Sequence, residues 1–300
     1  MPRELSFTVN QDETLRRVQT ILRARGVSRR LLTKLKAEPG GILCNGEAVR
    51  SIDLTAPGDV ITIFLPEDDE QPAIEFPLDI LYEDADVLVV NKPAGLAMHP
   101  TRNNQGVTLA SAVAAYLAAK GRSVTFRAIG RLDKGTSGLV LCALHGYAAS
   151  NLEGKAEKTY YALVHGEYIG CGTFTGAIYR PKANCTLRAC RPEGAEPQPG
   201  DSPAVTHWET LACADSVSFL RIRLETGRTH QIRAHFAANG TPLLGDDYYG
   251  APPRPKGRPF LHCGEMAFTH PVTGERMHFV AELPKDMAIY KITYMGGAHT

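Results

Sequence analysis

Short apolar runs, each too brief for a helix, recur between residues 80 and 224 and limit the possible folds of this chain most strongly. Glycine and polar residues separate them, as is typical of strands. The runs are 80–82, 87–90, 139–141, 160–164 and 219–224. Apolar residues at helical spacing are found at 107–119 and 229–238. Because few helices lie between many strands, we expect an α+β fold with a mixed, mainly antiparallel sheet rather than a doubly wound one.

The first 50 residues carry most of the positive charge. They contain ten Lys or Arg and five Asp or Glu, whereas the whole chain has a net charge of only +1. Eight of these basic residues lie between Thr14 and Ala37, a stretch without any acid. A polyanion is the simplest partner for such a stretch, because each phosphate contact releases condensed counterions. A solvated helix face is the alternative interpretation.

Two short basic helices followed by short strands are expected in this region. Apolar residues at three- and four-residue steps indicate helices at 14–25 and 28–38. Strands are expected at 42–44, 48–49 and 58–63. This order, with the sequences ILCNGEAV and PGDVITI, resembles the α-L RNA-binding motif of ribosomal protein S four. The resemblance implies a small α/β RNA-binding module at residues 1–66, and the acidic, proline-marked residues 67–77 are interpreted as a linker to a domain at 78–300.

A polar, glycine-rich segment precedes the expected strand at 139–141. It reads Gly-Arg-Leu-Asp-Lys-Gly-Thr-Ser-Gly and contains Arg131 and Asp133. A loop held at the end of a strand can fix a reactive group and keep it accessible. Taken alone, the segment is equally compatible with a turn satisfied by its own side chains.

Further motifs follow in order along the chain. They are NKPAGLAMHP at 91–100, Lys-x-Tyr-x-Ala at 158–162, TGRTHQIRAH at 226–235, Gly-Asp-x-x-Tyr-Gly at 245–250 and LHCGEMAFTHP at 261–271. Together with the segment around Asp133, they resemble the RluA family of pseudouridine synthases over residues 78–285. The resemblance implies a catalytic domain of the pseudouridine synthase type that isomerises uridines within structured RNA, with ribosomal RNA of the large subunit as the first expectation and transfer RNA as the second.

The resemblance also implies roles for four residues. Asp133 matches the catalytic aspartate, and Arg233 matches the arginine that pairs with it. A carboxylate covered by a nucleotide keeps its charge only beside a fixed cation, and Arg can offer a carboxylate a two-point fork. Tyr160 matches the aromatic residue that stacks on the target base, with a core tyrosine as the alternative, and Arg131 is placed to fill the space left by the turned-out nucleotide. The family usually has His where this chain has Gly130, which puts substrate preference in doubt.

The reaction rearranges one nucleotide and needs no redox cofactor, metal or group donor, so we expect no cofactor and no metal. His230 and His235 are poorly spaced for a helical metal pair, and Cys185, Cys190 and His207 match zinc spacing poorly. The chain has seven scattered cysteines, no run of 18 apolar residues and no signal-peptide pattern at its start. We therefore expect a monomeric cytoplasmic protein with no membrane partner.

Two other functions remain open at this stage. The first is an RNA-binding protein of the same fold without catalysis, although loss of Asp133, Tyr160 or Arg233 would then be expected and all three are present. The second is a glycoside hydrolase or nucleosidase with an aspartate nucleophile. Such an enzyme normally needs a second carboxylate, and local spacing fixes none beside Asp133.

Overall fold

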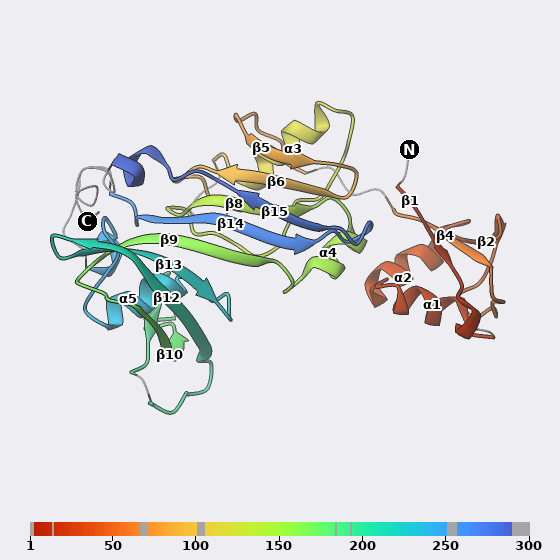
Figure 1. The fold of residues 1–300 in the computed structure, drawn as a ribbon. Coiled ribbons are helices and arrows are strands. Elements are labelled where there is room, and N and C mark those ends of the chain that lie inside the picture. Colours follow the sequence, from red (N-terminus) through yellow and green to blue (C-terminus); the bar gives the residue numbers. More distant parts are fainter. Residues whose placement is uncertain are drawn as a thin grey trace.

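The computed structural model describes residues 3–13, 15–66, 71–100, 106–183, 185–192, 194–250 and 257–289. These residues form two sheets, and Figure 1 shows the smaller one, with two helices, at one end of the larger. Among the described residues, no helix is long and apolar enough to cross a lipid bilayer.

The smaller sheet lies at the N-terminal end of the chain. Its order is β1 (Glu4–Thr8), β4 (Val60–Phe64), β2 (Ile42–Cys44) and β3 (Glu47–Ala48), with all pairs antiparallel. Helices α1 (Val18–Ala24) and α2 (Arg29–Ala37) pack on it, and a short 3₁₀ turn, η1 (Gln11–Glu13), precedes them. The Ser28 side chain accepts a hydrogen bond from the backbone N–H of Leu31 and so caps α2.

The first expected helix begins later than its apolar spacing predicts. Leu15 was expected on the buried face, but its φ is 56° and its side chain is 70% exposed. The backbone leaves helical geometry here because the N–H of Leu15 donates to the carbonyl of Thr55 and the N–H of Val18 to that of Asp53. Helix α1 therefore starts only at Val18.

The larger sheet has eleven strands. Its main path is β11 (Ala189–Cys190), β10 (Cys171–Tyr179), β12 (Ser202–Ala214), β13 (Val217–Leu224), β9 (Glu157–His165), β14 (Leu261–Thr269), β8 (Ser137–Ala143), β6 (Val87–Lys92) and β5 (Asp79–Glu83); β15 (Arg276–Val280) pairs with β14, and β7 (Arg127–Ala128) with β8. Only the pairing of β14 with β8 is parallel among these described strands. The expected mixed, mainly antiparallel α+β fold is confirmed.

Three helices and a 3₁₀ turn accompany the larger sheet. They are α3 (Leu109–Ala118), α4 (Gly146–Leu152), α5 (Gln231–Ala238) and η2 (Asp247–Tyr249). The sequence spacing indicated α3 and α5 but not α4, whose sequence GYAASNL has Tyr147 and Leu152 as its large apolar residues, five positions apart.

Strands β8 and β14 approach closely beside the loop that contains Asp133. Gly138 has a φ of +115°, and a Cβ at this position would lie 2.2 Å from the carbonyl oxygen of Cys263. Only glycine fits both this backbone conformation and this contact. The glycine therefore allows β14 to pair with β8 where the Asp133 loop enters the sheet.

Candidate active site

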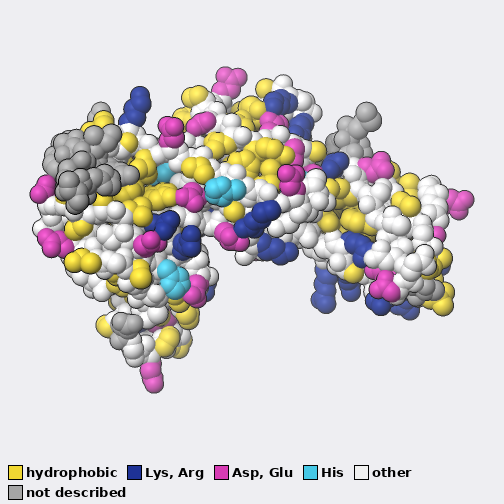
Figure 2. Space-filling model, viewed as in Figure 1, with side chains coloured by type: hydrophobic (Ala, Val, Ile, Leu, Met, Phe, Trp, Pro, Cys, Tyr) yellow, Lys and Arg dark blue, Asp and Glu magenta, His cyan; other side chains and the backbone are white. Residues whose placement is uncertain are grey.

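Asp133 lies in a cleft of about 2090 Å³. Figure 2 shows a hollow on the lower face of the molecule, with Lys and Arg side chains along it. The acidic residues that line the cleft are Asp133, Glu157 and Glu225, and the basic ones are Arg131, Lys134, Lys155, Lys158, Arg180, Arg188, Arg228, Arg233 and Arg258. This excess of positive charge suits a polyanionic ligand.

Backbone hydrogen bonds and one buried lysine hold the loop that contains Asp133. The N–H of Thr136 donates to the Asp133 carbonyl, and the N–H of Gly95 donates to the carbonyl of Lys134. The Lys92 ammonium, which has no solvent exposure, donates to the carbonyls of Pro93 and Leu96 at 2.9 Å and to that of Lys134 at 3.4 Å.

Burial lowers the pKa of Lys92 to about 7, although the nearby Asp133 carboxylate acts in the opposite direction. Through its hydrogen bonds to the carbonyls of Leu96 and Lys134, the Lys92 side chain joins the 93–96 turn to the Asp133 loop.

Arg233 bridges two carboxylates. From α5, its Nη1 donates to Asp133 Oδ2 at 3.2 Å, while its Nε and Nη2 donate to the two carboxylate oxygens of Asp246 at 2.7 and 2.8 Å. The expected pairing of Arg233 with Asp133 is present, but the two-point fork is on Asp246. Both side chains of that fork are buried, with 9% of Arg233 and 1% of Asp246 exposed. Asp246 thus fixes the guanidinium through Nε and Nη2, and Nη1 donates to Asp133.

An aromatic cluster covers the same guanidinium. The Tyr249 ring lies 4.8 Å from the guanidinium carbon of Arg233, and the Tyr248 ring lies 5.9 Å from it. The Tyr249 hydroxyl also meets His230 Nδ1 at 3.0 Å and accepts the backbone N–H of Arg188 at 3.1 Å. These contacts limit the orientations that Arg233 can adopt.

His230 lies directly beside the candidate catalytic carboxylate. Its Nε2 is 3.7 Å from Asp133 Oδ2, and its backbone has a φ of 57°, in the left-handed region that non-glycine residues rarely adopt. Burial lowers the pKa of His230 to about 4, and the Asp133 charge opposes this shift without overcoming it. The ring is therefore neutral near pH 7, and Arg233 is the charged partner of Asp133.

Tyr160 lines the cleft from β9. It is 7% exposed, and burial raises the pKa of its phenol well above the usual value. The next residue, Tyr161, packs on the other side of the strand, where its hydroxyl donates to Glu265. This alternation is the one expected for neighbouring residues of a strand.

Arg131 is an exposed residue of the cleft wall, two positions before Asp133. The preceding Gly130 has a φ of +77°, and a Cβ there would lie 2.8 Å from Lys158 Nζ. Lys158 Nζ in turn donates to the carbonyl of Ile129 at 2.8 Å. The Lys158 amine therefore occupies the space beside residue 130 that a longer side chain would need.

The other histidine and cysteine candidates lie in separate places. His235 is buried and its Nδ1 meets the Thr206 hydroxyl, while His262 Nδ1 meets the Ser137 hydroxyl behind the Asp133 loop. Among the described residues, Asp84, Asp86 and His270 are the group with three possible metal ligands within 4.8 Å of one another, and neither Cys185 nor Cys190 belongs to it.

Sequence reasoning identified Asp133, Arg233, Tyr160 and Arg131 and gave Asp246 no role. Asp246 is part of the Gly-Asp-x-x-Tyr-Gly segment, and its position after a buried Leu243-Leu244 pair was the available signal. A carboxylate that is itself buried needs a partner, but the sequence shows neither the burial of Asp246 nor its partner.

The chain is similar to known proteins of one family. Residues 86–238 match the family model described as RNA pseudouridylate synthase. The chain is 36% identical to the uncharacterized RNA pseudouridine synthase YjbO of Bacillus subtilis over 272 residues, covering 88% of this chain and 94% of the relative. It is 35% identical to ribosomal large subunit pseudouridine synthase D of Haemophilus influenzae, over 76% of this chain and 75% of that protein.

A solved structure also matches. The human RNA pseudouridylate synthase domain containing 1 superposes with a TM-score of 0.56 at 28% identity, covering 71% of this chain and 86% of that chain. The fold over this part of the chain is thus similar to that of a protein with this name.

Proposed function

Since the chain belongs to the RNA pseudouridylate synthase family and is an isomerase that acts on RNA, we propose that it converts uridines of large-subunit ribosomal RNA into pseudouridine with Asp133 as the catalytic carboxylate. The observation that carries the proposal is the position of Asp133 in a basic cleft, 3.2 Å from an arginine that a second acid anchors. Relatives from Haemophilus influenzae and Vibrio cholerae, each 35% identical, are named for the large ribosomal subunit, which supports this choice of RNA.

The chemistry needs a carboxylate at the sugar. The bond between ribose C1′ and uracil N1 breaks, the base rotates, and C5 joins C1′; C5 loses its hydrogen to water as a proton, and N1 gains one. Asp133 acts on the sugar, either as the nucleophile at C1′ or as the base that removes a sugar proton after the uracil has departed. Arg233 orients the carboxylate, because its guanidinium is itself fixed by Asp246.

Two further residues of the cleft bind the nucleotide in this proposal. Tyr160 stacks on the uracil from the cleft wall, of which its side chain forms part. Arg131 occupies the space that the everted nucleotide leaves in the RNA, since turning out a nucleotide costs about a few kcal/mol.

We assign RNA binding also to the N-terminal region. Residues 1–66 act as an RNA-binding module, 67–77 as a linker and 78–300 as the catalytic domain, and the protein works as a monomer in the cytoplasm, where ribosomal RNA is modified. Most basic side chains of the 14–37 stretch are exposed, which supports this role. Arg25 differs, because it forms a two-point ion pair with Glu13.

Mapping of pseudouridine in RNA from cells with and without this gene tests the proposal. Carbodiimide labelling should lose at least one stop in large-subunit ribosomal RNA when the gene is deleted, and the wild-type gene should restore it. Loss of stops in transfer RNA alone would assign a different substrate, and an unchanged map in all RNA would refute the proposed function.

A further inference from the structure

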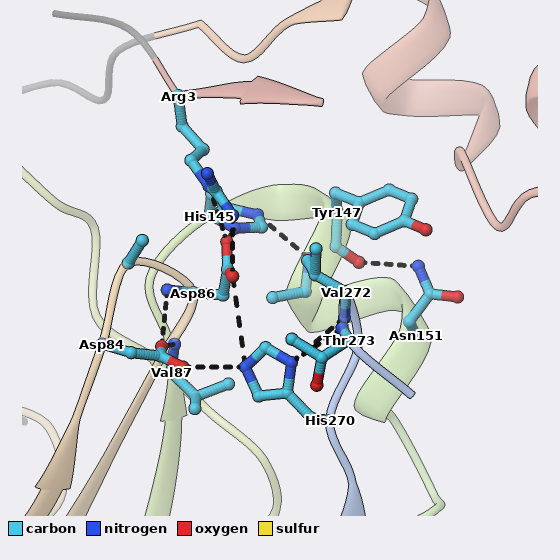
Figure 3. A network of polar contacts seen from close by, with 12 residues as sticks. Arg3, Asp84, Asp86, Val87, His145, Tyr147, Asn151, His270, Val272 and Thr273 are labelled. Atoms are coloured by element: carbon cyan, nitrogen blue, oxygen red, sulfur yellow. Dashed lines mark hydrogen bonds and ion pairs between the residues drawn. The ribbon is translucent and has the colours of Figure 1, made fainter. Parts of the chain in front are cut away.

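A buried carboxylate outside the cleft joins the two parts of the molecule. Asp86 is 3% exposed and follows β5, whereas Arg3 precedes β1 of the small sheet. Arg3 donates through Nε and Nη2 to the two oxygens of Asp86 at 2.8 and 2.9 Å, and His145 Nε2 lies 2.8 Å from Oδ1 (Figure 3). Both hydrogen bonds from Arg3 to this carboxylate thus come from the N-terminal part of the chain.

The neighbouring His270 and Asp84 do not make this cluster a metal site. The Nδ1 atom of His270 accepts the backbone N–H groups of Val272 and Thr273 at 3.3 and 3.0 Å. A neutral ring then carries its proton on Nε2, which lies 2.9 Å from Asp84 Oδ2 (Figure 3). Because metal ligation would need the Nε2 lone pair, this arrangement favours a network of protein contacts instead.

Helix α4 supplies a second set of contacts to the same N-terminal part. The Tyr147 hydroxyl donates to the carbonyl of Arg25 at 2.8 Å, and Asn151 Nδ2 donates to the carbonyl of Gly26 at 3.2 Å. The Tyr147 ring is 6% exposed and packs in the core of the N-terminal part, 5.9 Å from the ring of Phe7. These bonds satisfy carbonyl groups at the end of α1 that the helix itself leaves without partners.

The fit at Gly26 is close. Its φ is +86°, and a Cβ there would lie 2.2 Å from Asn151 Oδ1.

Burial acts to raise the pKa of Asp86, but the hydrogen bonds from His145 and Arg3 outweigh it and lower the pKa to about 2. If the N-terminal part moved away, Asp86 would lose its Arg3 contacts, so the docked arrangement is the favoured one.

The contacts lie next to one end of the basic cleft. Gly154 and Lys155, which line the cleft, follow closely after Asn151, while the exposed Arg29 and Arg30 begin α2 shortly after Gly26. Figure 2 shows Lys and Arg side chains on the lower face of both parts, with the hollow between them. Basic side chains therefore lie both at the start of α2 and along the cleft.

We propose that the Arg3–Asp86 pair and the α4 contacts hold residues 3–66 docked at one position, so that α2 and the cleft bind the same structured RNA at a fixed spacing. This inference rests on the proposed function and adds how the substrate is selected. A target uridine is modified when a phosphate-rich RNA segment lies at the matching distance from it. Two linked sites that are held in place bind one ligand together with a high effective concentration, and an undocked module loses part of that gain.

The test compares an interface variant with a matched control. Arg3→Met combined with Asn151→Ala removes contacts from both sides of the interface and leaves the cleft and the 14–37 stretch unchanged. Arg221→Met is the control, because it also removes one positive charge, while Arg221 lies outside residues 3–66 and the cleft and pairs with Glu209 on the neighbouring strand β12. A second interface variant, Tyr147→Phe, deletes only the hydroxyl that reaches Arg25 and keeps the packed ring.

Three quantities are measured on the full chain. They are the small-angle X-ray scattering curve, the affinity for an unmodified large-subunit ribosomal RNA transcript, and kcat/KM on that transcript and on a short stem-loop that carries the mapped uridine. We expect the interface variants to scatter as a more extended particle and to lose about tenfold or more in affinity and kcat/KM on the transcript. The stem-loop rate and the control should match the wild type.

Other results overturn the inference. An unchanged scattering curve would mean that these contacts do not hold the module, and an extended particle with full activity on the transcript would mean that its position does not matter. Equal losses on both RNAs would place the effect in the catalytic domain. If the wild type modifies neither RNA, the proposed function fails, whereas scattering and affinity still decide whether docking governs RNA binding.

Discussion

Replacement of Asp246 by Asn should damage both stability and catalysis, although Asp246 does not reach the substrate in our account. Its carboxylate accepts two hydrogen bonds from Arg233 at 2.7 and 2.8 Å, and the pair is almost completely buried. Removal of one charge from a buried ion pair costs about 3–5 kcal/mol. Because Arg233 keeps its contact with Asp133, we expect about 3 kcal/mol, the lower end of that range.

The catalytic loss follows from the same geometry. With a neutral partner at 246, the Arg233 fork is no longer held and can turn toward both oxygens of Asp133. In the native arrangement the hydrogen bond and ion pairs of Asp133 described above all involve Oδ2. A fork that also covers Oδ1 would make the carboxylate less available to the sugar, so kcat should fall by roughly tenfold or more, the equivalent of a displaced charged hydrogen bond.

The control is the neighbouring substitution Asp247→Asn. Asp247 is exposed, so the same change of charge there should alter the unfolding free energy by no more than about 0.5 kcal/mol. Urea denaturation gives the stability, and release of tritium from C5-labelled uridine in RNA gives the rate, because C5 loses its hydrogen in the reaction. If Asp246→Asn behaves like Asp247→Asn in both assays, our reasoning about the Arg233 bridge is wrong.

Three further predictions concern charge. Burial lowers the pKa of His230 to about 4, so its ring signals in NMR should titrate near pH 4, and a midpoint near 6.5 would contradict this. Because the unfolded chain then binds a proton at His230 that the folded protein does not, the free energy of unfolding should decrease as the pH falls from about 6.5 to 4. Asp86, with a pKa of about 2 in the fold and an ordinary value of 3.8, should stabilise the protein above pH 3.8 and lose this contribution as the pH falls through about 2. Asp86→Asn should therefore remove about 1–2 kcal/mol at pH 7 after allowance for the 39% exposure of Arg3, and equal stability of the two proteins in urea at that pH would argue against the pair. Deletion of residues 1–66 should weaken RNA binding and reduce its dependence on salt, and an equal slope of affinity against salt would exclude this region from binding.

The sequence allowed the strands and the reactive loop to be predicted because their signals are local. Apolar runs at 87–90, 160–164 and 219–224 correspond to β6, β9 and β13, each extended by a few polar residues. The motif around Asp133 precedes β8 as expected. In contrast, β10 and β12 lack a clear apolar run, because many residues of these strands are exposed or only partly buried.

The contacts that fix the site are mostly between distant residues, and no local pattern reveals them. Arg233 and Asp246 are 13 residues apart and meet only because η2 folds back over α5. Lys92 and the Asp133 loop are joined across 42 residues, and Arg3 and Asp86 across 83. The resemblance to the RluA family pointed to Asp133 and Arg233, whereas the groups that hold that arginine became visible only when the chain was folded.

A single-turnover measurement on Asp133→Asn tests the central claim most directly. Asparagine has nearly the same shape as aspartate but carries no charge, so the variant should bind the large-subunit ribosomal RNA transcript as tightly as the wild type and release no tritium from C5-labelled uridine. Tritium release at a rate near that of the wild type, with RNA affinity unchanged, would show that the Asp133 carboxylate is not the catalytic group.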